Sequence, residues 1–264
     1  MTGRARPLST TMRARDSRTR TLAIATLCAG LLLAGPVAAN PKAVVELFTS
    51  QGCSSCPPAD KLFGTLVKDP DLVVLSLPVN YWDYLGWKDT FATAENGARQ
   101  RAYADMRGDR AVYTPQAVVN GRSHAVGSDS RAIAAAVKKT GDLPVDVSAH
   151  MSDDALTVEV GPGKTPGMMA TVWLVLFDRS REVTIKRGEN RGRTISYHNV
   201  VRRMQAIGVW KGKAASYEMP RGELAKAGMQ GCAVLVQGED RKGHPGPIVG
   251  ATYLRRDLDK MTTR

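Results

Sequence analysis

The strongest constraint on the fold is a cysteine pair placed between a strand-like and a helix-like segment. Residues 43–47 read Ala-Val-Val-Glu-Leu, and Cys53 and Cys56 follow in the run Gly-Cys-Ser-Ser-Cys-Pro-Pro. Two intervening residues let both sulfurs lie within one helical turn. The start of a helix carries unpaired N–H groups and the positive end of the dipole, which favour a thiolate. The pattern predicts a redox-active pair with Cys53 as the nucleophile.

Up to about residue 140, strand-like and helix-like segments alternate. The apolar run Leu72 to Leu77 is typical of a central strand buried on both faces of a parallel sheet. We therefore expect an α/β domain over residues 40–142, with a helical insertion at 81–110. Strands are expected at 43–48, 72–77, 115–122 and 123–126, and helices at 57–68, 90–106 and 130–139.

Beyond residue 142 the pattern changes to short alternating strands separated by turn residues. Their number and spacing predict an all-β, sandwich-like C-terminal domain over residues 143–264. The expected strands are 145–151, 155–160, 170–177, 182–187, 194–201, 233–237 and 248–254.

The first 39 residues read as a cleaved secretory signal. Six arginines precede an almost wholly apolar stretch, Thr21 to Gly35, and small residues end at Ala39. The apolar stretch is shorter than the roughly 20 residues that span a bilayer, so we expect a periplasmic or secreted protein without a stable membrane anchor. Translation from either Met1 or Met12 would supply a sufficient signal.

Charge and cysteine content narrow the function further. Six of the 37 basic and one of the 25 acidic residues lie in the leader, so the formal charge falls from +12 to +7 after cleavage. The remaining basic residues are not interleaved with aromatics as in a nucleic-acid interface, so no nucleic-acid partner is expected. Three cysteines remain, Cys53, Cys56 and Cys232. One redox pair and one buried free thiol fit this number better than a disulfide framework.

Four segments carry a resemblance to known proteins. They are Glu46 to Asp60, Tyr81 to Asp89, Val112 to Gln116 and Arg187 to Thr194. With the order of the elements around them, they resemble the thioredoxin superfamily and, more closely, a family of secreted bacterial proteins known as domain of unknown function twelve-twenty-three. The implied fold is an α/β thioredoxin-like N-terminal domain followed by the all-β sandwich-like domain.

The superfamily resemblance implies thiol-disulfide chemistry at Cys53 and Cys56, with Pro115 in the cis form and facing the pair. Thr114, its neighbour, would then present backbone groups to an extended substrate, and Trp82 would either cover the site or pack the insertion against the sheet. Thioredoxins carry a buried acid six residues before the first cysteine, where this chain has Leu47. Glu46 is not assigned as a proton acceptor, because strand side chains alternate between faces.

Three functions compete. The first is an exported thiol-disulfide oxidoreductase that acts on protein or small-molecule thiols and disulfides, without a cofactor or metal. The second is a periplasmic copper-binding or chaperone protein that uses the same thiols, which suit soft Cu(I). The third is a non-catalytic partner-binding module in which Cys53 and Cys56 form a structural disulfide. The polar segment Arg187 to Arg193 is either an ordinary hairpin loop or a loop packed near Cys53.

Overall fold

The computed structural model describes residues 40–254, apart from 227, 229 and 242. The predicted signal peptide, residues 1–39, lies outside the described residues. Within the described part of the chain, no helix is both long and apolar enough to cross a membrane. The strands are β1 (Ala43–Thr49), β2 (Leu72–Pro78), β3 (Gln116–Val119), β4 (Ser123–Val126), β5 (Val147–Met151), β6 (Ala155–Val160), β7 (Ala170–Thr184), β8 (Thr194–Trp210), β9 (Ala215–Pro220), β10 (Gly231–Glu239) and β11 (Pro245–Leu254). The helices are α1 (Pro57–Leu66), the 3₁₀ turn η1 (Asp83–Leu85), α2 (Ala94–Arg107), α3 (Ser130–Thr140) and α4 (Arg221–Lys226).

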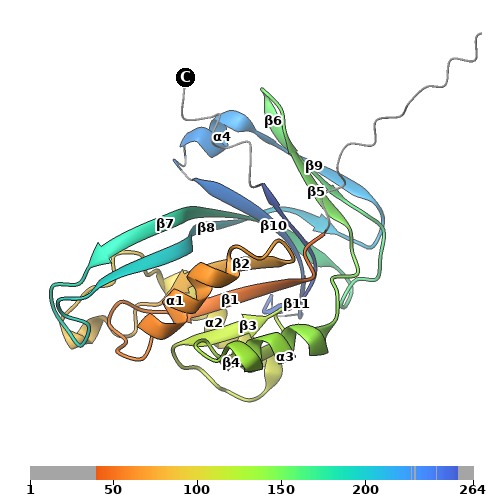
Figure 1. Ribbon diagram of the computed structural model, residues 1–264. Coiled ribbons are helices and arrows are strands. Elements are labelled where there is room, and N and C mark those ends of the chain that lie inside the picture. The colour runs from red at the N-terminus through yellow and green to blue at the C-terminus, as the bar shows by residue number, and fades with distance from the viewer. Residues whose placement is uncertain (1–39, 227, 229, 242, 255–264) are drawn as a thin grey trace, which may run out of the picture. The chain divides into compact units, whose positions relative to one another are not determined.

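Eight of the strands form one mixed sheet in the order β11-β10-β7-β8-β2-β1-β3-β4 (Figure 1). The predicted parallel pairing of β1 with β2 is confirmed over their full lengths. Strand β8 joins the other side of β2 in parallel, at Ser76 and Val200, and the remaining neighbours are antiparallel. A second antiparallel sheet has the order β5-β6-β9.

This topology overturns the predicted fold class. An α/β thioredoxin-like N-terminal domain followed by a separate all-β sandwich is wrong, because four strands from beyond residue 142 extend the sheet that β1 and β2 begin. Strand is the prevailing secondary structure, and the described residues belong to one compact unit. The physical reason is that the predicted N-terminal sheet would leave one edge of β2 unpaired, and β8 pairs with that edge.

Alternation along the strands places the core on both faces of the large sheet. In β1, Val45 and Leu47 pack under α1 and α3, whereas Val44 and Phe48 pack on the opposite side with Tyr103 of α2. A third cluster lies between the small sheet and β7, β10 and β11. Because β1 and β2 are buried along their whole lengths, the loops that leave their carboxyl ends start from a fixed support.

Strands β7 and β8 form a long hairpin that continues past the rest of the sheet (Figure 1). The sequence predicted a break near Asp178 to Arg181, yet β7 runs unbroken to Thr184. The ribbon is held there by cross-strand pairs such as Val183 with Ile195. Its apolar side packs on Trp87 and Phe91 of the segment 81–91, which is rich in aromatic residues and is called the aromatic segment below. The tip of this hairpin, residues 185–193, therefore reaches the region around the cysteine pair.

A buried polar network fastens α2 to the centre of the large sheet. Glu46 of β1 is fully buried and faces α2, where its Oε1 lies 2.8 Å from Arg99 Nε. Tyr103 donates its hydroxyl hydrogen to the other oxygen of Glu46. Arg99 also donates to Gln237 of β10. The network explains why Glu46 points away from the face that α1 covers, as the alternation of side chains suggested.

Candidate functional site

Cys53 and Cys56 form a disulfide between the end of β1 and the start of α1. Turn hydrogen bonds from Cys53 N to Ser50 O and from Cys56 N to Cys53 O shape this loop. Cys56 is the N-cap of α1, and the two prolines after it occupy the first helical positions, where no N–H is needed. The sequence pattern therefore placed the pair at a helix N-terminus correctly.

The peptide bond between Thr114 and Pro115 is cis, as the resemblance implied. Ser55 connects this bond to the cysteines: its Oγ donates to Thr114 O at 3.4 Å and lies 3.3 Å from Cys53 Sγ. Trp82 Nε1 donates to Thr114 Oγ1 at 2.7 Å. The structure thus brings together Cys53, Cys56, Thr114, Pro115 and Trp82, all of which the sequence had singled out as site residues.

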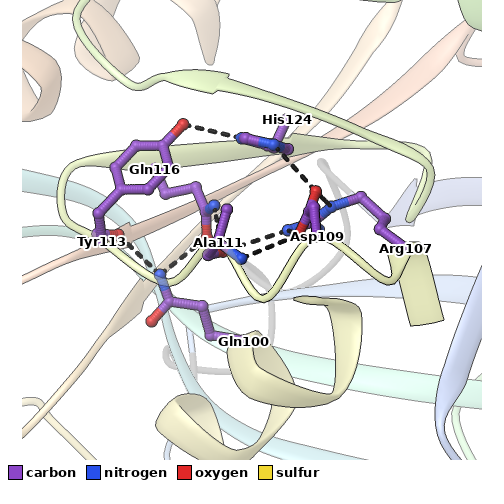
Figure 2. Close-up of polar contacts among 7 residues, drawn as sticks. All are labelled: Gln100, Arg107, Asp109, Ala111, Tyr113, Gln116 and His124. Atoms are coloured by element: carbon purple, nitrogen blue, oxygen red, sulfur yellow. Dashed lines mark hydrogen bonds and ion pairs between the residues drawn. The ribbon is translucent and has the colours of Figure 1, made fainter. Parts of the chain in front are cut away.

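Figure 2 shows how the loop before Pro115 is held in place. Tyr113 Oη lies 2.8 Å from His124 Nδ1, and the other ring nitrogen of His124 lies 3.2 Å from Asp109 Oδ2. Arg107 pairs with Asp109, and this contact holds the pKa of the Asp109 carboxyl down, to about 2. Gln100 of α2 donates to Tyr113 O. These contacts fix the backbone that carries Thr114 beside the disulfide.

A redox-active pair should be accessible to its partners, yet both cysteines of this disulfide are buried. Cys53 is 1% exposed and Cys56 is fully buried. Part of the cover comes from the aromatic segment, where Trp82 lies against Gly52 so closely that a Cβ there would be 3.1 Å from the Cβ of Trp82. Trp87 and Asp89 bind Gln51 from the same segment. Trp82 therefore contacts the site, and is not simply packing for the sheet.

The tip of the β7–β8 hairpin supplies the rest of the cover. Asn190 is fully buried, and its Nδ2 donates to Gln51 O at 2.9 Å and to Cys53 O at 2.8 Å. Glu189 accepts a hydrogen bond from Ser54 N. The segment Arg187 to Arg193 is thus both a hairpin loop and a loop packed on the cysteine loop. The hydrogen bonds to the cysteine loop come from the neutral amide of Asn190 and the carboxylate of Glu189.

Asp60 is the site residue that the sequence analysis missed. It lies four residues after Cys56, one helical turn along α1, and is 2% exposed. Its Oδ1 accepts a hydrogen bond from Thr49 Oγ1 at 2.8 Å, while Oδ2 has no partner among the described residues. Burial raises the pKa of the Asp60 carboxyl to about 8, and the nearby charge of Asp89 adds to the effect. The spacing of four along a helix was the available signal.

Two more unpaired polar atoms belong to residues around Asp60. The hydroxyl of Tyr197 and Oδ1 of Asn190 are buried without a hydrogen-bond partner among the described residues. The charge of Asp60 raises the pKa of Tyr197, after the larger effect of burial, so the phenol and the carboxyl lie near each other. Unpaired buried polar atoms are costly and rare, so this group is suited to exchanging protons or binding water behind the disulfide.

Cys232 belongs to the core of the protein and not to this site. Cys232 is a free thiol in the core between the two sheets, where burial raises its pKa to about 12. It packs as the small apolar side chain expected from the sequence. Among the described residues, no group of three or more His, Cys, Asp or Glu side chains has the arrangement of a metal site.

Loosening the hairpin tip should speed reduction of the disulfide. Replacing Asn190→Ala removes two hydrogen bonds to the cysteine loop, and each buried bond contributes about 1 kcal/mol. We expect dithiothreitol to reduce the variant up to about 30-fold faster, since the two bonds together contribute about 2 kcal/mol and 1.4 kcal/mol corresponds to a factor of ten. The measurement is alkylation of freed thiols over time. Thr184→Ala, which removes an exposed bond to Thr194 in the same hairpin, is the control. Equal rates for both variants would mean that the tip does not limit access.

Solved structures and a family model show which proteins this chain is similar to. It is similar to a crystal structure of a protein from Agrobacterium tumefaciens, with 39% sequence identity over 83% of this chain and 96% of the other, and a TM-score of 0.74. It is also similar to HBP35 of Porphyromonas gingivalis, with 14% identity over 81% of this chain and 74% of that one, and a TM-score of 0.52. At that identity the second likeness concerns the fold alone. No curated protein matches the chain. Residues 44–237 match the family described as protein of unknown function DUF1223, and the chain therefore belongs to the DUF1223 family.

Proposed function

We propose that the protein is an exported thiol-disulfide oxidoreductase that uses Cys53 and Cys56. The observation that carries the proposal is a disulfide at a helix N-terminus, flanked by the Thr114 carbonyl on one side and by a buried acid, Asp60, on the same helix. A disulfide that serves only as a staple needs neither neighbour. A loop of four residues is also too short for a crosslink to add much stability.

The proposed chemistry is thiol-disulfide exchange. A partner thiolate attacks the Cys53 sulfur, a new sulfur–sulfur bond forms, and Cys56 leaves as a thiolate. A second partner thiolate then attacks the partner's sulfur in this mixed disulfide and releases Cys53. Two electrons pass from the partner's thiols to the pair, and the reverse sequence oxidises the pair and reduces the partner.

Asp60 is proposed to supply the proton in this step. Its carboxyl holds a proton up to about pH 8 because it is buried. When Cys56 leaves, Asp60 would donate this proton to the Cys56 sulfur, and it would take the proton back when Cys56 attacks in the reverse direction. A charged thiolate and a charged carboxylate would otherwise be buried on one turn of α1, which is unfavourable.

The N-terminal segment supports export as part of the proposal. Arginines followed by an apolar stretch and small residues up to Ala39 are typical of a cleaved signal. Exported proteins work where disulfides persist, so a thiol-exchange protein there would find partner disulfides to act on.

Trapping a mixed disulfide tests the proposal. Reduced Cys56→Ser protein, mixed with a disulfide-linked peptide, should gain the mass of one peptide thiol on Cys53, because the residue that would release it is absent. The matched control is Cys53→Ser, which keeps Cys56 and the buried Cys232 and should gain nothing. Equal labelling of the two variants, or none in either, would contradict the assigned roles.

Burial of the pair favours a second candidate, a permanent structural disulfide. Equilibration of the wild-type protein in glutathione buffers separates the two. A redox-active pair should be half reduced between about −120 and −270 mV, whereas structural disulfides lie below about −300 mV. A value in the lower range would favour the structural role.

A further inference from the structure

A basic cleft lies directly beside the cysteine pair. Its volume is about 670 Å³, and α1 forms one wall and the start of β8 the other. Pro57, the residue after Cys56, stands at one end, and Lys68, just past the last turn of α1, also lines it. The cleft therefore begins where the proposed chemistry takes place.

The charges that line the cleft are all positive. Lys61 and Lys68 on the helix side and Arg193 on the hairpin side are exposed. None of the three is in an ion pair with another described residue, and no acidic side chain lines the cleft. Three unpaired cations on facing walls create a potential that attracts anionic groups.

The floor of the cleft is a close approach between α1 and β8 at a glycine. His198 of β8 lies against Gly64 in the middle of α1, where a Cβ would stand 2.7 Å from His198 Nε2. Glycine inside a helix costs roughly 0.5–1 kcal/mol relative to alanine. The imidazole is half-buried and can offer a hydrogen bond from the floor.

The length of the cleft indicates the form of its occupant. Pro57, Lys61, Gly64 and Lys68 follow one face of the helix at spacings of three and four. Pro57 and Lys68 are separated by eleven rises of about 1.5 Å, which correspond to roughly 16 Å. An extended chain of about five residues, at 3.3 Å each, covers this distance. Lys61 and Lys68 are seven residues, or roughly 10 Å, apart along this face, so a single small anion does not contact both.

We propose that this cleft binds an extended acidic segment of a partner protein and thereby presents a neighbouring cysteine of that partner to Cys53. The assignment rests on the proposed exchange function and adds the class of substrate to it. Acidic residues of the partner, a few positions away from the partner's cysteine, would lie between Lys61 and Arg193. The partner's cysteine would lie beyond Pro57.

Peptide pairs test this assignment. One peptide carries a cysteine in a disulfide followed by glutamates, and its twin has glutamines in their place. With the reduced wild-type protein at low salt, we expect the acidic peptide to exchange about tenfold faster, because exposed ion pairs are individually weak and about three act together. Lys61→Glu/Arg193→Glu should remove the preference of the protein for the acidic peptide over the glutamine peptide. Lys139→Glu/Lys164→Glu, on exposed surfaces outside the cleft, has the same net charge change and should keep the preference.

Binding without chemistry separates this proposal from the exchange function. Fluorescence anisotropy of a cysteine-free acidic peptide on the oxidised protein should detect binding that Lys61→Glu/Arg193→Glu abolishes. Equal exchange of both peptides by the wild type would overturn the acidic-segment proposal while exchange itself stands. If neither peptide exchanges, the exchange function is overturned. The anisotropy measurement alone then shows whether the cleft binds an acidic segment. A glutamate dipeptide that binds as tightly as the longer segment would also overturn the proposal.

Discussion

Replacing Arg99→Ala should lower the free energy of unfolding by about 3–5 kcal/mol, because it leaves the Glu46 carboxylate buried without its partner. Glu46 is fully buried, and the Arg99 side chain is only 10% exposed. Arg99 also donates to Tyr103 Oη at 2.7 Å and to Gln237 Oε1 at 2.8 Å. One substitution therefore removes a hydrogen-bond partner from Glu46 on β1, Tyr103 on α2 and Gln237 on β10. The measurement is urea unfolding followed by circular dichroism, with the disulfide intact.

An exposed ion pair provides the matched control. Lys42 and Asp71 lie 2.7 Å apart, with side chains 57% and 42% exposed, so Lys42→Ala should cost far less than Arg99→Ala. The double variant Glu46→Leu/Arg99→Met should recover much of the loss, because an apolar pair of similar size removes the unpaired charge. An Arg99→Ala cost no larger than that of Lys42→Ala would show that water reaches Glu46.

The sequence predicted individual elements better than their assembly. Apolar runs identified β1 and β2, and the helix predicted at 130–139 coincides with α3. The polar stretch around Asp178 suggested a turn, yet a two-stranded ribbon satisfies its own backbone hydrogen bonds and tolerates polar side chains on its exposed side. Strand β9 was missed altogether. Its pairing with β6 joins segments 60 residues apart, and that pairing cannot be read from local periodicity.

The same limit applies to the candidate site. Cys53, Cys56 and Pro115 could be found from sequence because their spacing and chemistry are local. Their burial could not, since the cover comes from Asn190, which hydrogen-bonds a residue 137 positions earlier. Asp60 was within reach of a local argument. The thioredoxin resemblance pointed to an acid before Cys53 in the strand, whereas the buried acid, Asp60, follows Cys56 in the helix.

Replacing Asp60→Asn should remove the pH dependence of stability that this site causes. The folded protein holds the Asp60 proton up to about pH 8, whereas an aspartate in the unfolded chain loses it near pH 3.9. Between these values the folded state binds more protons, so its stability falls as the pH rises, by up to about 1.4 kcal/mol per pH unit, and levels off above pH 8. Asparagine does not titrate and can still accept a hydrogen bond from Thr49. The variant should therefore gain stability relative to wild type at each step from pH 5 to pH 8.

Urea unfolding of the oxidised proteins at pH 5, 6, 7 and 8 measures this difference. Asp89, whose pKa burial raises to about 6, adds a slope of the same sign in both proteins and largely cancels. The matched control is Asp109→Asn: the Asp109 pKa is lowered to about 2, so its contribution is present above pH 4 and does not change from pH 5 to 8. If Asp60→Asn tracks wild type in parallel across the range, the Asp60 carboxyl is already ionised in the folded protein. It could then not donate a proton to Cys56, and the proposed exchange would have to draw that proton from water.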